Sequence, residues 1–188
     1  MRRGFKAEAE RLADRTRAQL GLQPHAPLPI RDLAGHLKVE IYAADDLIDR
    51  ARIEELDAEQ PGAFSAATFH LPDGRTVVVY NPCSDACRTN SDLAHELAHL
   101  LLNHDVRELQ QIAGHTFFTC DREQEEEANW LAGCLLLPRL LLLKEIYAGA
   151  DAAAVAQKHN VSVPMARFRI NTSGVLLQAR RSRTYRTT

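Results

Sequence analysis

Two histidines and a glutamate lie within the five residues His95-Glu96-Leu97-Ala98-His99. This is the HExxH pattern, and on a helix two side chains four residues apart lie on one face, about 5–6 Å from each other. The two histidines can therefore share one tetrahedral zinc ion. Glu96 is rotated toward the open side of such a site, where it can act as a general base toward the attacking water. The motif predicts a zinc site held by His95 and His99.

The third protein ligand that a catalytic zinc ion needs must be found beyond this motif. His104 follows closely in the sequence, but Leu102 and Asp105 stand where the metzincin pattern has glycine and histidine. The sequence therefore excludes the metzincin class. It favours a carboxylate from a later helix.

Carboxylates are concentrated at the start of a later predicted helix. Two of them, Glu123 and Glu126, are interpreted as solvated carboxylates that the helix dipole favours in the first turn. Glu125 differs because it shares its helix face with small residues, which let this helix approach another one closely and point the carboxylate at the zinc. Asn129, one turn further on, could accept the remaining N–H of a ligating histidine. Glu127 remains the main rival of Glu125 as the third ligand.

The helices that must position these residues are visible in the apolar periodicity. Apolar residues recur at helical spacing over residues 84–104 and 121–137, with polar residues at both starts. These two helices are predicted to carry the chemistry. The same pattern predicts an N-terminal amphipathic helix over residues 5–20 and a short helix over residues 30–37.

A small sheet is predicted from alternating and β-branched segments. Residues 39–42 alternate in the manner of a strand. Residues 63–71 and 76–80 flank Pro72-Asp73-Gly74, whose residues supply the backbone angles of a tight turn. The pair therefore predicts a β-hairpin.

Composition limits the class of protein. The chain has 188 residues, of which 45% are hydrophobic, and a formal net charge of −2, so we expect one globular domain and no bulk polyanion binder. No apolar run reaches the ~18 residues that a membrane span needs, and no secretory signal is recognisable, so we expect a cytoplasmic protein. In that compartment we expect reduced thiols at every cysteine: Cys83, Cys87, Cys120 and Cys134.

The two site motifs together resemble a known family. The run from Arg88 to His104, followed by the run from Glu125 to Pro138, resembles the ImmA/IrrE family of zinc metallopeptidases, and the resemblance covers roughly residues 25–145. It implies a gluzincin-like intracellular protease with one Zn²⁺ per chain and with Glu125 as the third ligand. Several family members cleave helix-turn-helix repressors of mobile elements or stress regulons. The resemblance therefore implies such a repressor as the protein substrate.

Two further roles in the site stay open at the level of sequence. A second group should stabilise the oxyanion that develops during hydrolysis, and Tyr80, His104 and His115 are all candidates. In related zincins an extended substrate pairs with an edge strand beside the active-site helix, and by resemblance residues 76–80 are the candidate. The substrate strand would then have Val77, Val78 and Val79 at its centre. The alternative is an ordinary buried strand.

Another class of function is suggested by residues 152–169, which have the rhythm of a helix-turn-helix. Arg167 and Arg169, with the basic tail over residues 180–186, would suit contacts with DNA, so the alternative function is a zinc-containing DNA-binding regulator. However, Ala, Val, Met and Phe dominate both helices, as in a packed helical hairpin. We therefore favour packing on the protease and expect neither direct nucleic-acid binding nor a membrane partner.

These observations predict an α+β, zincin-like metallopeptidase with a small sheet, two zinc-bearing helices and a C-terminal helical segment. We expect a single metallopeptidase domain over residues 1–188. Its parts would be an N-terminal scaffold over 1–60, a catalytic core over 61–148, and a C-terminal helical segment with a basic tail over 149–188. The expected function is that of a selective zinc-dependent endopeptidase that cleaves a helix-turn-helix repressor and so derepresses its genes.

Overall fold

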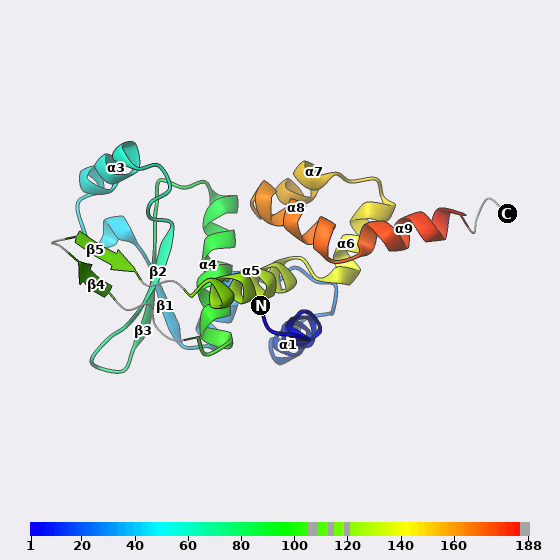
Figure 1. Ribbon diagram of the computed structural model, residues 1–188, viewed down its shortest axis with the longest axis horizontal. Coiled ribbons are helices and arrows are strands. Elements are labelled where there is room, and N and C mark those ends of the chain that lie inside the picture. The colour runs from blue at the N-terminus through cyan, green and yellow to red at the C-terminus, as the bar shows by residue number, and fades with distance from the viewer. Residues whose placement is uncertain (105–108, 113–114, 119–120, 185–188) are drawn as a thin grey trace.

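The fold is an α+β arrangement with a small sheet at one end of the molecule and helices through its centre and its other end (Figure 1). The computed structural model describes residues 1–104, 109–112, 115–118 and 121–184, with the backbone alone at 109–112, 115–118 and 183–184. The predicted α+β class is confirmed, and the architecture is that of a zincin-like peptidase domain.

The described helices follow one another as α1 (Phe5–Gln19), α2 (Ile30–His36), the 3-10 turn η1 (Ala44–Asp46), α3 (Arg50–Glu59), α4 (Ala86–Leu101), α5 (Arg122–Leu136), α6 (Arg139–Tyr147), α7 (Ala152–His159), α8 (Val163–Thr172) and α9 (Val175–Thr184). The described strands are β1 (Val39–Ala43), β2 (Ala66–His70), β3 (Thr76–Tyr80), β4 (Leu109–Ile112) and β5 (His115–Phe118). The helices and the hairpin expected from the sequence are present. Their ends differ from the expected ones by a few residues.

The three-stranded sheet has the order β1-β3-β2. β2 and β3 form the predicted antiparallel hairpin, whose turn includes Gly74 at a φ of 87°, a conformation that glycine adopts without strain. β1 joins the other side of β3 as a parallel strand. β3 is therefore the central strand, and β2 lies at an edge.

This strand order contradicts the expectation that β3 pairs with an extended substrate. Val77, Val78 and Val79 cannot pair with an extended peptide, because the backbone groups of β3 already pair with β1 on one side and with β2 on the other. Val78 is fully buried in the main core, and its two neighbours pack in a smaller cluster with Ile53 and Ala44. The continuous run of valines thus belongs to a strand that is covered on both faces.

Local capping explains where the two site helices begin. The side chain of Asp85 accepts a hydrogen bond from the backbone N–H of Arg88 at 2.9 Å and caps α4. Asp121 caps α5 in the same way, accepting from the N–H of Glu123 at 2.8 Å. Each carboxylate satisfies an N–H group that the first turn of a helix leaves without a partner.

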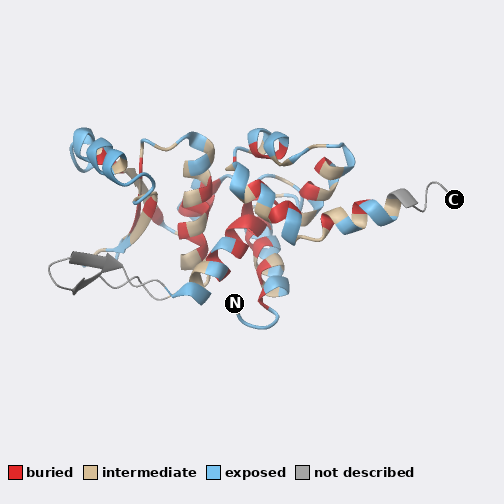
Figure 2. Cartoon of the chain, turned by 45° about the horizontal axis from the view of Figure 1, so that its top comes forward, coloured by how far each residue is buried: buried red, intermediate tan, exposed pale blue. Residues whose placement is uncertain are grey.

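The centre of the molecule is the contact between α4 and α5. Small side chains allow the two helices to approach closely, and all of them are buried: Ala94, Ala98, Ala128 and Ala132. Larger apolar residues fill the space around them, including Leu93, Leu97, Leu131 and Leu135. α1 packs against α5, and the buried residues concentrate along these helices in Figure 2. The site helices are therefore held by the main core.

The C-terminal helices pack on this core, as the sequence favoured. The guanidinium of Arg169 in α8 is fully buried, and its Nε and Nη2 donate to the carbonyl oxygen of Leu137 at 3.2 and 3.1 Å. Nη2 also donates to Oε1 of Glu10 in α1 at 2.9 Å. The idea that Arg169 contacts DNA is therefore wrong, because this side chain is used to join α8 to α1 and to the end of α5.

The thiols agree with the reduced state expected from the sequence where they are described. Cys83, Cys87 and Cys134 are free cysteines, and Cys120 lies outside the described residues. Burial raises the pKa of Cys134 to about 12, despite the nearby charges of Arg169 and Arg17. Among the described residues, no helix is long and apolar enough to cross a membrane.

Candidate active site

The two motifs found in the sequence meet at one point between α4 and α5. His95 Nε2 lies 3.0 Å from His99 Nε2, and the carboxylate of Glu125 lies 3.1 Å from the first of these nitrogens and 3.4 Å from the second. In a tetrahedral site with metal–ligand distances near 2.0–2.1 Å, the ligand atoms are about 3.3 Å apart. The observed spacing and the donor set of two imidazoles and a carboxylate therefore fit a metal ion such as zinc.

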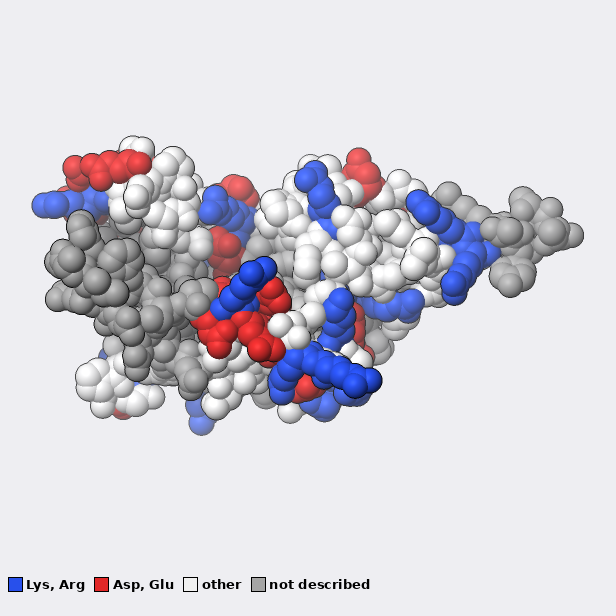
Figure 3. All heavy atoms as spheres, viewed as in Figure 1, with Lys and Arg blue, Asp and Glu red and all other residues white. Residues whose placement is uncertain are grey.

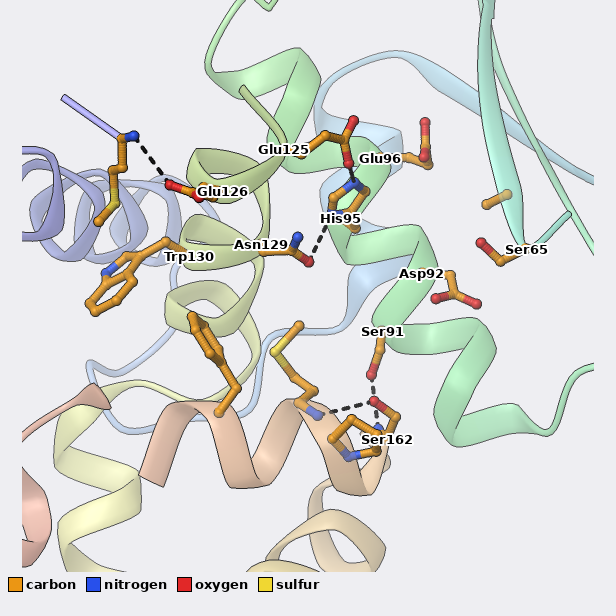
Figure 4. A pocket seen from close by; sticks show the side chains of 15 residues that line it. Ser65, Ser91, Asp92, His95, Glu96, Glu125, Glu126, Asn129, Trp130 and Ser162 are labelled. Atoms are coloured by element: carbon orange, nitrogen blue, oxygen red, sulfur yellow. Dashed lines mark hydrogen bonds and ion pairs between the residues drawn. The ribbon is translucent and has the colours of Figure 1, made fainter. Parts of the chain in front are cut away.

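Asn129 supports the first histidine. Its Oδ1 lies 3.2 Å from Nδ1 of His95, and Figure 4 shows the two side chains facing each other across α4 and α5. An amide oxygen accepts a hydrogen bond, so Nδ1 carries the proton and Nε2 presents its lone pair to the centre of the cluster. The structure thus brings Asn129 to the place that the sequence suggested.

The end of α4 brings His104 behind the second histidine. Asn103 has a φ of 51°, in the left-handed region, and the chain reverses there. The backbone N–H of His104 donates to the carbonyl of His99 at 3.0 Å, and that of Asn103 donates to the carbonyl of Leu100 at 3.1 Å. These two bonds are the Schellman motif of a helix C-terminus. As a result, Nδ1 of His104 lies 3.0 Å from Nδ1 of His99.

The contact between His99 and His104 links the two tautomers, that is, which nitrogen of each ring carries the proton. If Nε2 of His99 faces the cluster, its Nδ1–H donates to Nδ1 of His104, which then carries its own proton on Nε2. That Nε2 lies 3.7 Å from Oε2 of Glu127. Burial, together with the charge of His99, lowers the pKa of His104, which agrees with a neutral ring that accepts a hydrogen bond. His104 therefore supports a candidate ligand from behind and is not placed to stabilise an oxyanion.

Glu127 is separated from the metal cluster by its own partners. It is buried, and its carboxylate accepts from the backbone N–H of Arg2 at 3.0 Å and from Nε of the same arginine at 3.3 Å. With His104 on its other side, it completes a chain of contacts that ends at His99. Of the two rival carboxylates, the structure places Glu125 at the cluster and Glu127 behind it. Glu123 and Glu126 are exposed, as expected.

The base candidate Glu96 lies on the side of α4 that faces the sheet. Its side chain is buried, and Oε2 accepts a hydrogen bond from the hydroxyl of Thr68 in β2 at 2.7 Å. The contact joins the edge strand to the HExxH helix. It fixes one carboxylate oxygen of Glu96 beside the histidine cluster.

A cleft of about 810 Å³ opens beside these residues (Figure 4). Its walls come from α4, α5, the N-terminal part of α8, the residues at the start of β2 and the N-terminal residue Met1. The lining residues include His95, Glu96, Glu125 and Asn129 from the predicted site, and Ser65, Asp92, Trp130, Ser162, Met165 and Phe168 outside it. A peptide-sized ligand can therefore reach the candidate metal centre.

The other candidates for the second electrophile are not brought to this cleft by any described contact. Tyr80 lines a different cavity, together with Ile30, Arg31 and Leu93, on another side of α4. His115 lies in β5, but its side chain is outside the described residues, so its role stays a prediction from the sequence. The electrophile is the one catalytic role that the described residues leave unassigned.

A helix that presents two histidines and a glutamate, packed beside a second helix that presents another glutamate, defines the zincin-like class of metallopeptidases. A family model described as the IrrE N-terminal-like domain, Peptidase_M78, matches residues 52–171. Because this match covers more than half of the sequence, the chain belongs to this metallopeptidase family, the ImmA/IrrE family that the motifs resemble. A comparison with curated proteins finds no match.

The family match also reaches further along the chain than the motifs do. It ends at residue 171 and so includes α7 and most of α8. This agrees with the position of α8 as a wall of the cleft. Neither this wall nor the roles of Thr68 and Asp92 were predicted from the sequence. Of these, only Asp92 had a local signal, because it lies three residues before His95 on the same helix face.

Proposed function

We propose that this chain is a zinc-dependent endopeptidase that uses His95, His99 and Glu125 as metal ligands and Glu96 as the general base. One observation carries the proposal: three ligand atoms from two helices converge within 4.8 Å, next to a buried glutamate and an open cleft. When bound, a zinc ion supplies the Lewis acidity that makes water a nucleophile near neutral pH and polarises a peptide carbonyl.

The residues of this chain would perform the remaining steps. Glu96 takes the proton from the attacking water at its carboxylate and later delivers it to the leaving amine. Thr68 holds one oxygen of this carboxylate through its 2.7 Å hydrogen bond and so fixes the orientation of the group that takes the proton. Asn129 and His104 fix the ring orientation of His95 and His99, respectively. Each histidine ligand thus has a supporting partner before the metal binds.

The substrate would bind as an extended segment. β2 is an edge strand, and its Thr68 contacts the base, so a peptide added along β2 would pass the reacting groups. β2 replaces the valine strand β3 as the proposed substrate strand. We further propose that residues 1–188 act as one metallopeptidase domain, since α8 lines the cleft and is joined to α1 through Arg169 and Glu10.

Within the family, the proposed substrate is a helix-turn-helix repressor, cleaved in an exposed linker or a locally opened helix. The family match supports a protein substrate, and the repressor is the substrate that the resemblance of the motifs implies. We expect a selective enzyme, because a cleft formed within one domain would accept an extended segment that the substrate exposes rather than a folded protein.

The test is to incubate the zinc-loaded protein with casein and with the helix-turn-helix repressor encoded nearest its gene, following fragments by mass spectrometry. We expect specific fragments of the repressor, slow or no loss of casein, and no fragments with Glu96→Gln, which retains zinc. Rapid casein degradation with an intact repressor would overturn the selective role. Repressor cleavage by Glu96→Gln at the wild-type rate would overturn the assignment of the base.

A further inference from the structure

The cleft contains an aspartate that the metal site does not use. Asp92 lies one helical turn before His95, on the face of α4 that lines the cleft (Figure 4). Its Oδ2 atom is buried and has no hydrogen-bond partner among the residues that the structure describes. The one ion pair described for this carboxylate is a long one, 3.7 Å from Nε of the half-exposed Arg88.

A buried carboxylate oxygen without a hydrogen-bond partner can be stabilised by a positively charged ligand. Removing a charged oxygen from water costs free energy unless a hydrogen bond or an opposite charge replaces the lost hydration. Burial accordingly raises the pKa of Asp92, although the charges of Arg88 and His95 act in the opposite direction. The Asp92 side chain is 24% exposed and lines the cleft, so a cation delivered from the cleft can approach this carboxylate and supply the opposite charge.

The surroundings of Asp92 fit a long basic side chain. Ser65 and Ser162 line the cleft with it and offer hydroxyl groups, while Pro164 and Met165 of α8 offer apolar surface. Lysine and arginine bury their methylene stems against such surface and keep the charge at a polar end. An arginine would also place two N–H groups against one carboxylate.

The electrostatics of the rest of the cleft agree with a cationic ligand. Three further carboxylates line it, those of Glu96, Glu125 and Glu126. The one cation among its described lining residues is the N-terminal ammonium of Met1, which lies 3.2 Å from Oε2 of Glu126. The first turn of α5 is also acidic, with Glu123 and Glu125, and Figure 3 shows a group of acidic side chains with basic side chains beside it. A bound zinc ion and the Met1 ammonium would offset part of this negative charge, and the remainder favours the approach of a basic segment.

We propose that Asp92 forms a subsite that binds an arginine or lysine side chain of the substrate, close to the bond that is cleaved. The subsite rests on the proposed peptidase function and adds a substrate class to it: peptide segments with a basic residue near the scissile bond. Asp92 is three residues, about 4.5 Å along the helix axis, from the first candidate metal ligand, so the recognised residue lies near the reacting carbonyl.

The test measures binding separately from hydrolysis. A set of fluorescein-labelled Gly/Ala hexapeptides carries arginine at one position after another, and each has a partner with citrulline, which has the same shape without the charge. Binding to the zinc-loaded Glu96→Gln protein is followed by fluorescence anisotropy. For at least one position we expect the arginine peptide to bind about tenfold more tightly than its citrulline partner.

Variants of the cleft then assign this preference to one carboxylate. Asp92→Asn should remove the difference between the two peptides. Glu126→Gln removes an equal charge from the same cleft and should keep most of the difference. Arg88→Ala should increase it, because this change releases Asp92 from its ion pair. Equal binding of all pairs, no binding of any arginine peptide, or full discrimination by Asp92→Asn would each overturn the proposal.

Hydrolysis by the wild-type chain separates this proposal from the peptidase function. Cleavage of arginine and citrulline peptides at equal rates would leave the peptidase standing and overturn the subsite. Discrimination in binding without any cleavage by the wild-type protein would support the subsite and count against the peptidase.

Discussion

The hydroxyl of Thr68 lies 2.7 Å from Oε2 of Glu96, so the edge strand of the sheet directly contacts the base of the HExxH motif. A hydrogen bond to a carboxylate is stronger than one between neutral groups, and here the acceptor is buried. The contact links the strand on which we expect the substrate to bind with the group that we expect to move the proton.

The first prediction concerns this hydroxyl. Thr68→Val keeps the shape of the side chain but removes the donor, so we expect kcat to fall about tenfold while KM changes little. Zinc content should stay the same, because Thr68 does not contact the ligands. Thr68→Ser retains the donor and should keep most of the activity. Steady-state kinetics on a cleaved peptide measure both variants, and an unchanged kcat for Thr68→Val would remove the positioning role.

The second prediction separates the two carboxylates on α5. Glu125→Ala removes a candidate ligand, whereas Glu127→Ala removes a partner of His104, which acts through His99. Loss of such a supporting group weakens metal binding about 10–100-fold, and we expect Glu125→Ala to exceed that range. Competition with a chromophoric zinc chelator gives the dissociation constants, with the exposed Glu123→Ala as the control. Equal losses at positions 125 and 127 would contradict the assignment.

The third prediction tests the packing of α5 against α8. A Cβ atom at Gly133 would lie 2.4 Å from Cδ of Arg169, whose side chain is fully buried and cannot move aside. We expect Gly133→Ala to lower the free energy of unfolding by about 1–3 kcal/mol. Gly35→Ala is the matched control, since it adds the same methyl group at an exposed position of α2, where no neighbouring atom lies within 4 Å. Urea titration should show unchanged or slightly higher stability for the control.

The fourth prediction concerns stability against pH. Glu145 in α6 accepts hydrogen bonds from Lys158 at 2.9 Å and His159 at 3.2 Å. Burial raises the pKa of this carboxyl, but the two hydrogen bonds outweigh burial and hold the pKa below its ordinary value of 4.5. A lowered pKa stabilises the fold above pH 4.5, and this contribution is lost as the pH falls through the pKa of the folded state.

We therefore expect Glu145→Gln to be less stable than the wild type at pH 7, by about 1 kcal/mol. The difference should shrink as the pH falls below 4.5, because the wild-type carboxyl then becomes neutral too. Urea titrations at pH 7 and at a pH below 4.5 measure the difference in the free energy of unfolding. The exposed Glu59→Gln serves as the control. A difference that stays constant with pH would exclude the ion-pair contribution.

The sequence could predict the parts of the site that depend on local geometry. Spacing of four residues places His95 and His99 together on any helix, and the small side chains of α5 indicated which face, and hence which glutamate, meets α4. Capping aspartates lie next to the starts of both helices, so their boundaries were close to those predicted. These features need no knowledge of the rest of the chain.

The parts that could not be predicted depend on contacts between distant segments. β3 is central because β1 pairs with it across more than thirty residues of sequence, and nothing in its own residues states that partner. The hydrogen bond between Thr68 and Glu96 depends on how the sheet docks on α4. Arg169 looked like a surface cation, but the carbonyl of Leu137 and the carboxylate of Glu10 enclose it. Its burial is visible only in three dimensions.

The candidate metal ligand His99 lies in the last turn of α4, just before the chain reverses at Asn103. Helix ends ordinarily fray at such a position. The backbone and ring contacts of His104 hold that turn, so we expect metal binding and the stability of the helix C-terminus to be thermodynamically coupled. Amide protons near Asn103 should therefore exchange with solvent more slowly when metal is added. Those at the opposite end of α4, which Asp85 caps, should exchange at an unchanged rate. Metal occupancy would then be readable from the backbone alone, without any assay of catalysis.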